Sequence, residues 1–409
     1  MIKVIHIHYA TESGGSAAVR IQKAFSKANI DSGIVSLESD DVEGTEKITY
    51  LGKRARFISR VDIRLQMYLT RNAKKEYGLF SYPVLGTNVA KLDEVKNADI
   101  IFIHWALRGL LNLKSIKQIA ALNKPVILFM HDMWFITGGC HYSFDCEKYI
   151  TGCNKCPVFL SEKINDLAAK EFGKKIKLYS KYSNLYFVSP SKWLYNCVKQ
   201  SLLAKNKSVF YIPNILDDTM FKPFDKNTAR QILNIDAAET VIAFGAVTVE
   251  SPYKGWEYLQ KALEILSHNE SSQKITVLIF GSSYNKQIAD AIPFNTKFMG
   301  YLRDEYSTSL VYNAADVFIA PSLAEAFGYV VMEALSCGTP VVGFNIGGIP
   351  DMIKHKENGY LANYKDAEDL ANGIKFCLQT KPKGYLPAEL APALTIQKYL
   401  DLFSQFKII

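Results

Sequence analysis

The sequence has no apolar run long enough to cross a membrane. A transmembrane helix needs roughly 18–20 consecutive apolar residues, and no segment of this 409-residue chain reaches that length. The N-terminal residues Met1–His8 start a strand-like pattern and lack the apolar stretch and small-residue cleavage site of a signal peptide. We therefore expect a cytoplasmic location. Short-period repeats and low-complexity tracts are also missing, which argues against a solenoid or a disordered chain.

Cysteine is scarce: the chain has seven, and four of them fall in one short stretch with the spacing C-x5-C-x6-C-x2-C. In a cytosolic protein such a cluster favours a structural zinc site over disulfides, because the compartment keeps thiols reduced. Unligated thiols and disulfides are the alternatives to this prediction. The four candidate ligands are Cys140, Cys146, Cys153 and Cys156.

The charges are unevenly spread along the chain. Residues 1–212 hold 31 lysines and arginines against 18 aspartates and glutamates, a net charge of +13, whereas residues 213–409 hold 17 against 22, a net charge of −5. The length exceeds one ordinary hydrophobic core, so two domains are expected. The charge difference favours domains with different partners. The alternative is that the charge serves only solubility and is unevenly distributed by chance.

Strand-like apolar runs alternate with helix-like stretches through both halves. The rhythm stops near residues 212–222 and restarts at Val241–Ala246, which predicts a hinge between two α/β domains. The alternation itself predicts mostly parallel sheets with helices on both faces. The clearest strand patterns lie at Ile2–Ile7, Ile100–His104, Val126–His131, Tyr186–Ser189, Ile275–Phe280 and Val317–Ala320.

Residues 321–342 carry the most specific pattern. They follow the strand that ends at Ala320, and a helix beginning near Phe327 or Gly328 would place free N–H groups at the carboxyl edge of the sheet. Doubly wound sheets bind ligands at that edge, and a helix N-terminus suits a diphosphate. Glu325 before the helix and Glu333 inside it offer acceptors for sugar hydroxyls. From spacing alone, a capping glutamate and a solvated one are an equal alternative.

This pattern resembles the family 4 retaining glycosyltransferases of the GT-B fold, whose signature is E-x-F-G-x-x-x-x-E followed by A-x-x-x-G-x-P-V. Three further segments are similar to the family: the residues before the signature (Leu310–Ser322), those after it (Gly347–Asp351) and the hinge (Ile212–Pro223). The resemblance therefore covers nearly the whole chain. The matching signature residues are Glu325, Phe327, Gly328, Glu333, Gly338 and Pro340.

The resemblance implies a GT-B architecture, in which two Rossmann-like doubly wound domains face each other across a cleft. Residues 1–211 would form an acceptor domain, and the C-terminal helix at 394–409 would pack back on it. Residues 212–393 would form the nucleotide-sugar donor domain.

The resemblance also implies residue roles in the donor domain. Glu325 would contact the donor sugar and take part in catalysis, and Glu333 would bind the ribose hydroxyls. The backbone amides of Ala326, Phe327 and Gly328 would approach the sugar and the phosphates.

Diphosphate binding is where the chain departs from the family. The family usually places an arginine and a lysine on the diphosphate; Lys254 matches the lysine, but the arginine position holds Val247 or Thr248. Lys254 would then carry more of the charge compensation, with help from the hydroxyl of Thr248 or Ser251. A plain surface lysine is the alternative.

In the first domain the resemblance points to a glycine pair and a histidine. The loop with Gly14 and Gly15 lies beside the donor phosphates or the acceptor in the family, although a Gly-Gly pair alone often marks only a turn. His131 ends a strand, where the family has a cleft histidine that touches the donor sugar and matters for catalysis. A structural histidine is the alternative.

The implied chemistry is transfer of a glycosyl group from a nucleoside-diphosphate sugar with retention of configuration. No D-x-D motif is present, so we expect catalysis without a metal or another cofactor. Lys254 and the helix amides would stabilise the leaving diphosphate. Glu325 and Glu333 should bind the donor from one side, unlike the paired carboxylates of a retaining hydrolase. This favours a front-face route in which the leaving phosphate accepts the proton of the acceptor.

The segment from His131 to Tyr142 resembles a bacterial subgroup that makes exopolysaccharide or capsule. It implies a glycan or a lipid-linked oligosaccharide as the acceptor. The alternatives are a nucleotide-sugar epimerase of the same fold and a non-catalytic module that binds nucleotide sugars. The intact glutamate pair and His131 favour the enzyme, because fold alone cannot separate these functions.

A basic segment at Lys53–Lys75 predicts association with the inner face of the plasma membrane. Phe57, Val61, Leu65 and Tyr68 recur at helical spacing among eight lysines and arginines. A basic amphipathic helix of this kind can lie on an anionic membrane surface. An ordinary surface helix with its apolar face on the core is an equal alternative. Nucleic acid is not expected as a partner, because no interleaved aromatic stacking pattern is present.

Overall fold

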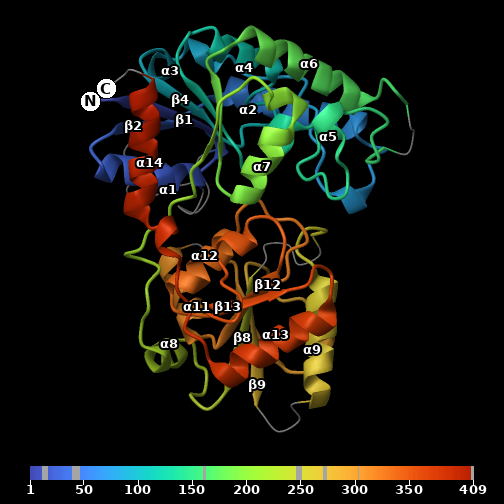
Figure 1. Ribbon diagram of the computed structural model, residues 1–409, viewed down its shortest axis with the longest axis vertical. Coiled ribbons are helices and arrows are strands. Elements are labelled where there is room, and N and C mark those ends of the chain that lie inside the picture. The colour runs from blue at the N-terminus through green and yellow to red at the C-terminus, as the bar shows by residue number, and fades with distance from the viewer. Residues whose placement is uncertain are drawn as a thin grey trace. The chain divides into compact units, whose positions relative to one another are not determined.

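The computed structural model describes residues 1–11, 17–38, 47–159, 163–245, 251–269, 274–302 and 304–406. The chain divides into two compact units (Figure 1). The first unit comprises Met1–Ile215 and the C-terminal segment from Ala393, and the second comprises Leu216–Pro392. No helix within the described ranges is long and apolar enough to span a membrane.

The first unit contains a seven-stranded sheet in the order β3-β2-β1-β4-β5-β6-β7, and all neighbouring strands are parallel. The strand order reverses between β1 and β4, so the carboxyl ends of these two strands form a topological switch point, where such sheets bind ligands. The strands are β1 (Lys3–Ala10), β2 (Asp31–Glu38), β3 (Ile48–Tyr50), β4 (Ile100–Ile103), β5 (Val126–Phe129), β6 (Leu185–Ser189) and β7 (Val209–Tyr211).

Helices follow the strands because the connecting segments carry start signals. Asn112, Asp166 and Ser191 each accept a hydrogen bond from the backbone amide of the third residue of the helix, which satisfies one of the helix's free donors. The α-helices of this unit are α1 (Ala17–Lys27), α2 (Lys53–Leu69), α3 (Asp93–Lys96), α4 (Leu113–Ala120), α5 (Lys148–Thr151), α6 (Leu167–Lys181), α7 (Lys192–Gln200) and α14 (Pro392–Gln405).

Helix α14 completes the core of the first unit. The ring of Phe25 in α1 lies 5.0 Å from that of Tyr399 and 5.6 Å from that of Phe403, measured between ring centroids. All three side chains are fully buried together with Phe102 of β4. The last helix of the chain therefore packs on the sheet formed by the N-terminal residues.

The second unit contains a six-stranded parallel sheet in the order β10-β9-β8-β11-β12-β13. Its order reverses between β8 and β11, which gives this unit a switch point of its own. The strands are β8 (Thr240–Gly245), β9 (Ile275–Phe280), β10 (Asn295–Gly300), β11 (Val317–Ala320), β12 (Val341–Phe344) and β13 (Gly359–Ala362). The α-helices are α8 (Lys226–Ile232), α9 (Trp256–Asn269), α10 (Lys286–Asp290), α11 (Glu305–Ala314), α12 (Tyr329–Ser336) and α13 (Ala367–Thr380).

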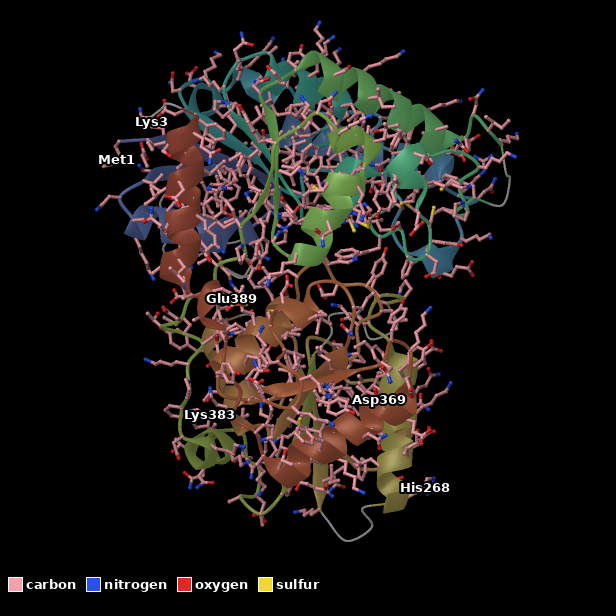
Figure 2. All side chains as sticks on the ribbon, in the orientation of Figure 1. Met1, Lys3, His268, Asp369, Lys383 and Glu389 are labelled. Atoms are coloured by element: carbon pink, nitrogen blue, oxygen red, sulfur yellow. The ribbon has the colours of Figure 1, made fainter. Side chains whose placement is uncertain are left out.

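Helix α13 is tied to the edge strand β13 by a carboxylate. Asp369, labelled in Figure 2, accepts hydrogen bonds from the hydroxyl of Tyr360 at 2.8 Å and from the amide of Asn363 at 2.7 Å. Short 3-10 helices complete the chain at Lys75–Tyr77, Val89–Lys91, Trp134–Ile136, Leu202–Ala204, Ile349–Asp351 and Ala388–Leu390. Each unit is a parallel sheet with helices, so the prediction of two Rossmann-like domains is confirmed.

Candidate functional site

The turn from β11 into α12 has the geometry that an approaching ligand requires. Gly328 is the residue before the helix, and it adopts the left-handed conformation with φ of 101°, which side chains rarely accept. Among the described residues, the N-cap residue Gly328 has no side chain that could cap the start of α12. A helix N-terminus without a side-chain cap attracts anions through its free N–H groups and its dipole.

The loop after β12 packs against this turn. The amide of Gly348 donates to the carbonyl of Glu325 at 3.1 Å. Gly347 has a φ of 59°, and a Cβ atom there would lie 1.9 Å from the same carbonyl oxygen. Only glycine therefore fits at 347, and the loop after β12 fixes the backbone that carries Glu325.

Lys254 and Glu325 come together at the switch point between β8 and β11. The Nζ of Lys254 lies 3.3 Å from Oε2 of Glu325, and the side chains are 33% and 18% exposed. The backbone holds them there, because the amide of Leu323 donates to the carbonyl of Tyr253 at 2.8 Å. The two residues that sequence analysis assigned to diphosphate and sugar thus form an ion pair.

Glu333 is buried inside α12, with 7% of its surface exposed. The hydroxyl of Tyr312, in α11, donates to Oε2 of Glu333 at 2.9 Å. Tyr312 is itself fully buried, so this bond fixes the direction in which the carboxylate points. Sequence analysis did not find Tyr312, because an aromatic residue in a helix resembles any other core residue.

The predicted residues of the second unit are thus gathered around one turn. Ala326 and Phe327 lie in the loop between β11 and α12 and are buried, at 4% and 3% exposed. Gly14, Gly15, Val247 and Thr248 lie outside the described residues.

In the first unit, His131 belongs to a set of four histidines on three neighbouring strands. His6 and His8 are on β1, His104 follows β4 and His131 follows β5. The Nδ1 of His6 lies 2.9 Å from Nε2 of His104, and the Nδ1 of His104 lies 2.8 Å from Nε2 of His131. Sequence analysis found only His131. The H-x-H pattern in β1 was a usable signal, because alternate residues of a strand share one face.

Burial keeps these histidines neutral. It lowers the pKa of His6 to about 3, that of His8 to about 4 and that of His131 to about 3. It also lowers the pKa of His104 well below the usual value. The imidazoles can therefore exchange hydrogen bonds at neutral pH but carry no positive charge for a phosphate.

Asp132 is anchored next to His131 by a separate network. Its Oδ2 lies 2.5 Å from Nδ1 of His141, and its Oδ1 accepts from the amide of Trp134 at 2.7 Å. The Nε2 of His141 in turn lies 2.8 Å from the hydroxyl of Ser81. Burial alone would raise the pKa of Asp132, but His141 and the Trp134 amide offset this and leave the pKa below its usual value. Asp132 and His131 line one small pocket.

The four clustered cysteines line a common pocket but do not form a metal site in this geometry. Among the described residues, no group of three or more His, Cys, Asp or Glu side chains could hold a metal ion. Burial raises the pKa of Cys140, Cys153 and Cys156 to about 12, which favours neutral thiols. The amide of Gly138 donates to Sγ of Cys153 at 3.2 Å. The zinc site, with Cys146 as its fourth ligand, stays a prediction.

Comparison with known proteins finds sequence similarity mainly in the second unit. Residues 238–380 match the family described as glycosyl transferases group 1. A D-inositol 3-phosphate glycosyltransferase of Rhodococcus opacus is 31% identical over 169 residues, which is 39% of this chain and 37% of that protein. An uncharacterized glycosyltransferase of Methanocaldococcus jannaschii is 24% identical over 306 residues, 71% of this chain and 75% of that protein.

Solved structures match the whole chain in fold. A glycosyltransferase of Rickettsia africae superimposes with a TM-score of 0.67 at 14% identity, covering 100% of this chain and 99% of that one. HepE of Anabaena, in complex with UDP, gives a TM-score of 0.64 at 15% identity, covering 99% and 100%. The fold is therefore GT-B, as predicted, and the sequence match to the group 1 glycosyl transferases lies within the second unit. The matched part of this chain spans only 37% of the length of the Rhodococcus relative.

Proposed function

We propose that this chain is a family 4 retaining glycosyltransferase that transfers a sugar from a nucleoside-diphosphate sugar without a catalytic metal. One observation carries the proposal: Lys254 and Glu325 form an ion pair just before α12, the helix that contains Glu333, at a sheet switch point. The acceptor is a glycan or a lipid-linked oligosaccharide of surface-polysaccharide assembly. The HepE structures with UDP and with UDP-glucose support a nucleotide-sugar donor.

The parts of the donor find partners of matching chemistry around this turn. The N-terminus of α12 carries a positive partial charge of about half an elementary unit, which favours the diphosphate. Glu333, held by Tyr312, accepts the ribose hydroxyls. When a sugar hydroxyl binds the carboxylate of Glu325 in place of Lys254, the ammonium group of Lys254 becomes available to the diphosphate.

Bond breaking then needs no enzymic nucleophile. The anomeric carbon–oxygen bond breaks as the diphosphate leaves, and Lys254 with the helix amides stabilises its charge. The acceptor hydroxyl attacks from the same face, and its proton passes to the leaving phosphate oxygen. This front-face route retains the anomeric configuration, so NMR of the product must give the anomer of the donor. An inverted product would refute the route but leave the transferase function intact.

The test of function combines binding with transfer. UDP, GDP and ADP sugars are first compared by thermal shift, and the stabilising donor is then incubated with polyprenyl-linked and free glycan acceptors. Glu333→Gln should lose both stabilisation and transfer, whereas Glu368→Gln, an exposed carboxylate in α13, should keep both. Binding without transfer to any acceptor would favour the non-catalytic module, and a changed sugar without an acceptor would favour the epimerase. An inositol phosphate acceptor is included because the Rhodococcus relative is named for one.

We further propose that α2 holds the chain at the inner membrane surface. Its inward face is polar: Asp62 accepts from the amides of Val84 and Leu85, both at 2.8 Å, and Ser59 donates to the carbonyl of Arg108 at 2.6 Å. Several large apolar residues of the helix consequently point outward. Phe57, Met67 and Tyr68 are 66%, 67% and 64% exposed, among exposed arginines.

An exposed face that combines aromatic and basic side chains fits an anionic lipid surface. We expect the protein to sediment with vesicles that contain phosphatidylglycerol and not with neutral vesicles. Replacing Arg56, Arg60 and Arg64 by glutamate should abolish sedimentation. The matched control replaces Lys170, Lys177 and Lys181, three exposed lysines of α6, by glutamate and should leave sedimentation unchanged. Equal sedimentation of both variants would contradict the assignment to α2.

A further inference from the structure

A continuous line of hydrogen bonds crosses four neighbouring strands of the first unit. It runs from Ser32 on β2 to His6 on β1, then to His104 after β4 and His131 after β5. The Oγ of Ser32 lies 3.1 Å from Nε2 of His6. We call these four residues the imidazole chain. Ser32, His6 and His104 are buried, at 2%, 0% and 0% exposed, so only the His131 end approaches the surface.

The imidazole chain has only two consistent arrangements of its protons. A neutral imidazole has one N–H donor and one acceptor nitrogen. The two contacts between histidines each join two ring nitrogens, so in each contact one nitrogen must donate and the other accept. The three rings must therefore all carry their protons on Nδ1, or all on Nε2. The lowered pKa values of His6 and His131 exclude a charged ring near neutral pH.

Ser32 decides between the two arrangements. Within the described residues, its hydroxyl has no hydrogen-bond partner except His6. If His6 donated to Ser32, the hydroxyl proton would be buried without an acceptor, which is unfavourable. If Ser32 donates instead, His6 donates through Nδ1 to His104, and His104 donates through Nδ1 to Nε2 of His131. The proton of His131 then sits on Nδ1.

We propose that the imidazole chain fixes His131 as a neutral Nδ1–H donor toward a ligand hydroxyl, with Ser32, His6 and His104 as positioning residues. In the part of the chain that the structure describes, Nδ1 of His131 has no protein partner and is not a buried unpartnered atom, so a ligand can reach it. The role for the sugar substrate rests on the proposed function; the proton arrangement does not. His131 is thereby a donor and not a general base.

His8 supplies the matching acceptor beside it. Its Nδ1 contacts the carbonyl of Ala10, which can only accept, so the proton of His8 sits on Nδ1 and its Nε2 is an acceptor. The amide of Ala10 lies farther from the same nitrogen, at 3.3 Å. The rings of His8 and His131 are 6.1 Å apart between centroids. A hydroxyl suits this pair because it can accept from His131 and donate to His8, whereas a phosphate or carboxylate oxygen only accepts.

Nitrogen NMR tests the chain without any substrate. Protein labelled with ¹⁵N-histidine is recorded at pH 7 with long-range ¹H–¹⁵N correlations, which distinguish Nδ1–H, Nε2–H and doubly protonated rings. Single substitutions assign the seven histidines. We expect His6, His104 and His131 all to carry the proton on Nδ1, which is the less common form of free histidine in water. A His131 ring protonated on Nε2, or on both nitrogens, would overturn the proposal.

Two variants test whether the chain acts at a distance. Ser32→Ala removes the terminal donor and should convert His131 into a mixture of both forms. Ser36→Ala is the matched control, because Ser36 is a buried serine of the same strand whose hydroxyl donates to the carbonyl of Tyr9 at 3.1 Å, outside the chain. It should leave His131 unchanged. An unchanged His131 in Ser32→Ala refutes the coupling.

The NMR experiment tests the proton arrangement, and the activity assay tests the proposed function, so either can be refuted without the other. If the rings have the expected protons but no sugar is transferred, the proposed function is wrong and the proton arrangement stands. If transfer occurs, Ser32→Ala should lower kcat/KM about tenfold, the effect of weakening one hydrogen bond in the transition state. Ser36→Ala should not, and equal losses in the two variants would count against a positioning role for Ser32.

Discussion

Replacing Tyr312 by phenylalanine tests the role of one hydrogen bond at the proposed donor site. The substitution keeps the buried ring and removes only the hydroxyl that donates to Glu333 at 2.9 Å. Hydrogen bonds to charged groups contribute about 1.5–3 kcal/mol. We expect the free energy of unfolding to fall by about 2 kcal/mol, which lowers Tm by roughly 4–8 °C for a unit of this size.

Nucleotide binding should weaken as well, because Glu333 is no longer held in one direction. We expect an increase in Kd of about tenfold, or about 1.4 kcal/mol. In a thermal-shift assay at a nucleotide concentration 100 times the wild-type Kd, ligand stabilisation should fall from about 2.7 to about 1.4 kcal/mol. Isothermal titration with the same nucleotide gives the Kd directly.

A tyrosine of the other unit provides the control. Tyr179 is buried, and its hydroxyl donates to the carbonyl of Phe135 at 3.0 Å. Tyr179→Phe should therefore destabilise the protein, by about 1 kcal/mol, without changing the Kd. If Tyr312→Phe binds nucleotide as tightly as wild type, Tyr312 only packs and the reasoning is wrong.

Three further predictions follow from the same geometry. Gly328→Ala places a side chain at a φ of 101° and should cost about 1–3 kcal/mol of stability and weaken nucleotide binding, measured by thermal shift; Gly52→Ala, where a Cβ meets nothing within 4 Å, is the control. Stability should fall as pH drops from about 6.5 toward 4, because histidines of the unfolded chain take up protons in this range while His6, with a folded pKa of about 3, does not. Each such histidine lowers the free energy of unfolding by about 1.4 kcal/mol per pH unit. A Tm that is constant from pH 7 to 4.5 would contradict this prediction. Elemental analysis of protein never exposed to chelator decides between zinc and free thiols at the four cysteines: the described geometry, which holds no metal site, predicts no stoichiometric zinc, whereas one zinc per chain would support the prediction from the cysteine spacing.

Local patterns predicted the sheets well. The apolar run Ile100–His104 corresponds to β4, Val126–His131 begins with β5 and Ile275–Phe280 is β9, because buried parallel strands are apolar on both faces and stand out in the sequence. The turn around Glu325 and Gly328 was also predictable, since its residues lie close together in the sequence and the positive φ of Gly328 favours glycine.

Features that depend on distant partners were not predictable. The apolar periodicity of α2 predicted a helix but left open which face points inward. The inward face is fixed by hydrogen bonds to Val84, Leu85 and Arg108, which lie far along the chain. A single hydrogen bond of the imidazole chain, from His6 to His104, spans 98 positions, and the bond from Tyr312 to Glu333 spans 21. Each residue alone resembles an ordinary core residue.

The ion pair between Lys254 and Glu325 changes how the missing arginine should be understood. While the pair is intact, the two side chains have no net charge to offer a diphosphate, and the α12 N-terminus supplies only a partial charge. A donor that presents both a sugar hydroxyl to Glu325 and a diphosphate to Lys254 can replace both halves of the pair at once. A nucleoside diphosphate without the sugar must separate the pair and leave Glu325 without a partner. If the chain is the transferase proposed above, it should therefore favour the complete nucleotide sugar over the nucleoside diphosphate, and this difference in affinity should help to release the product.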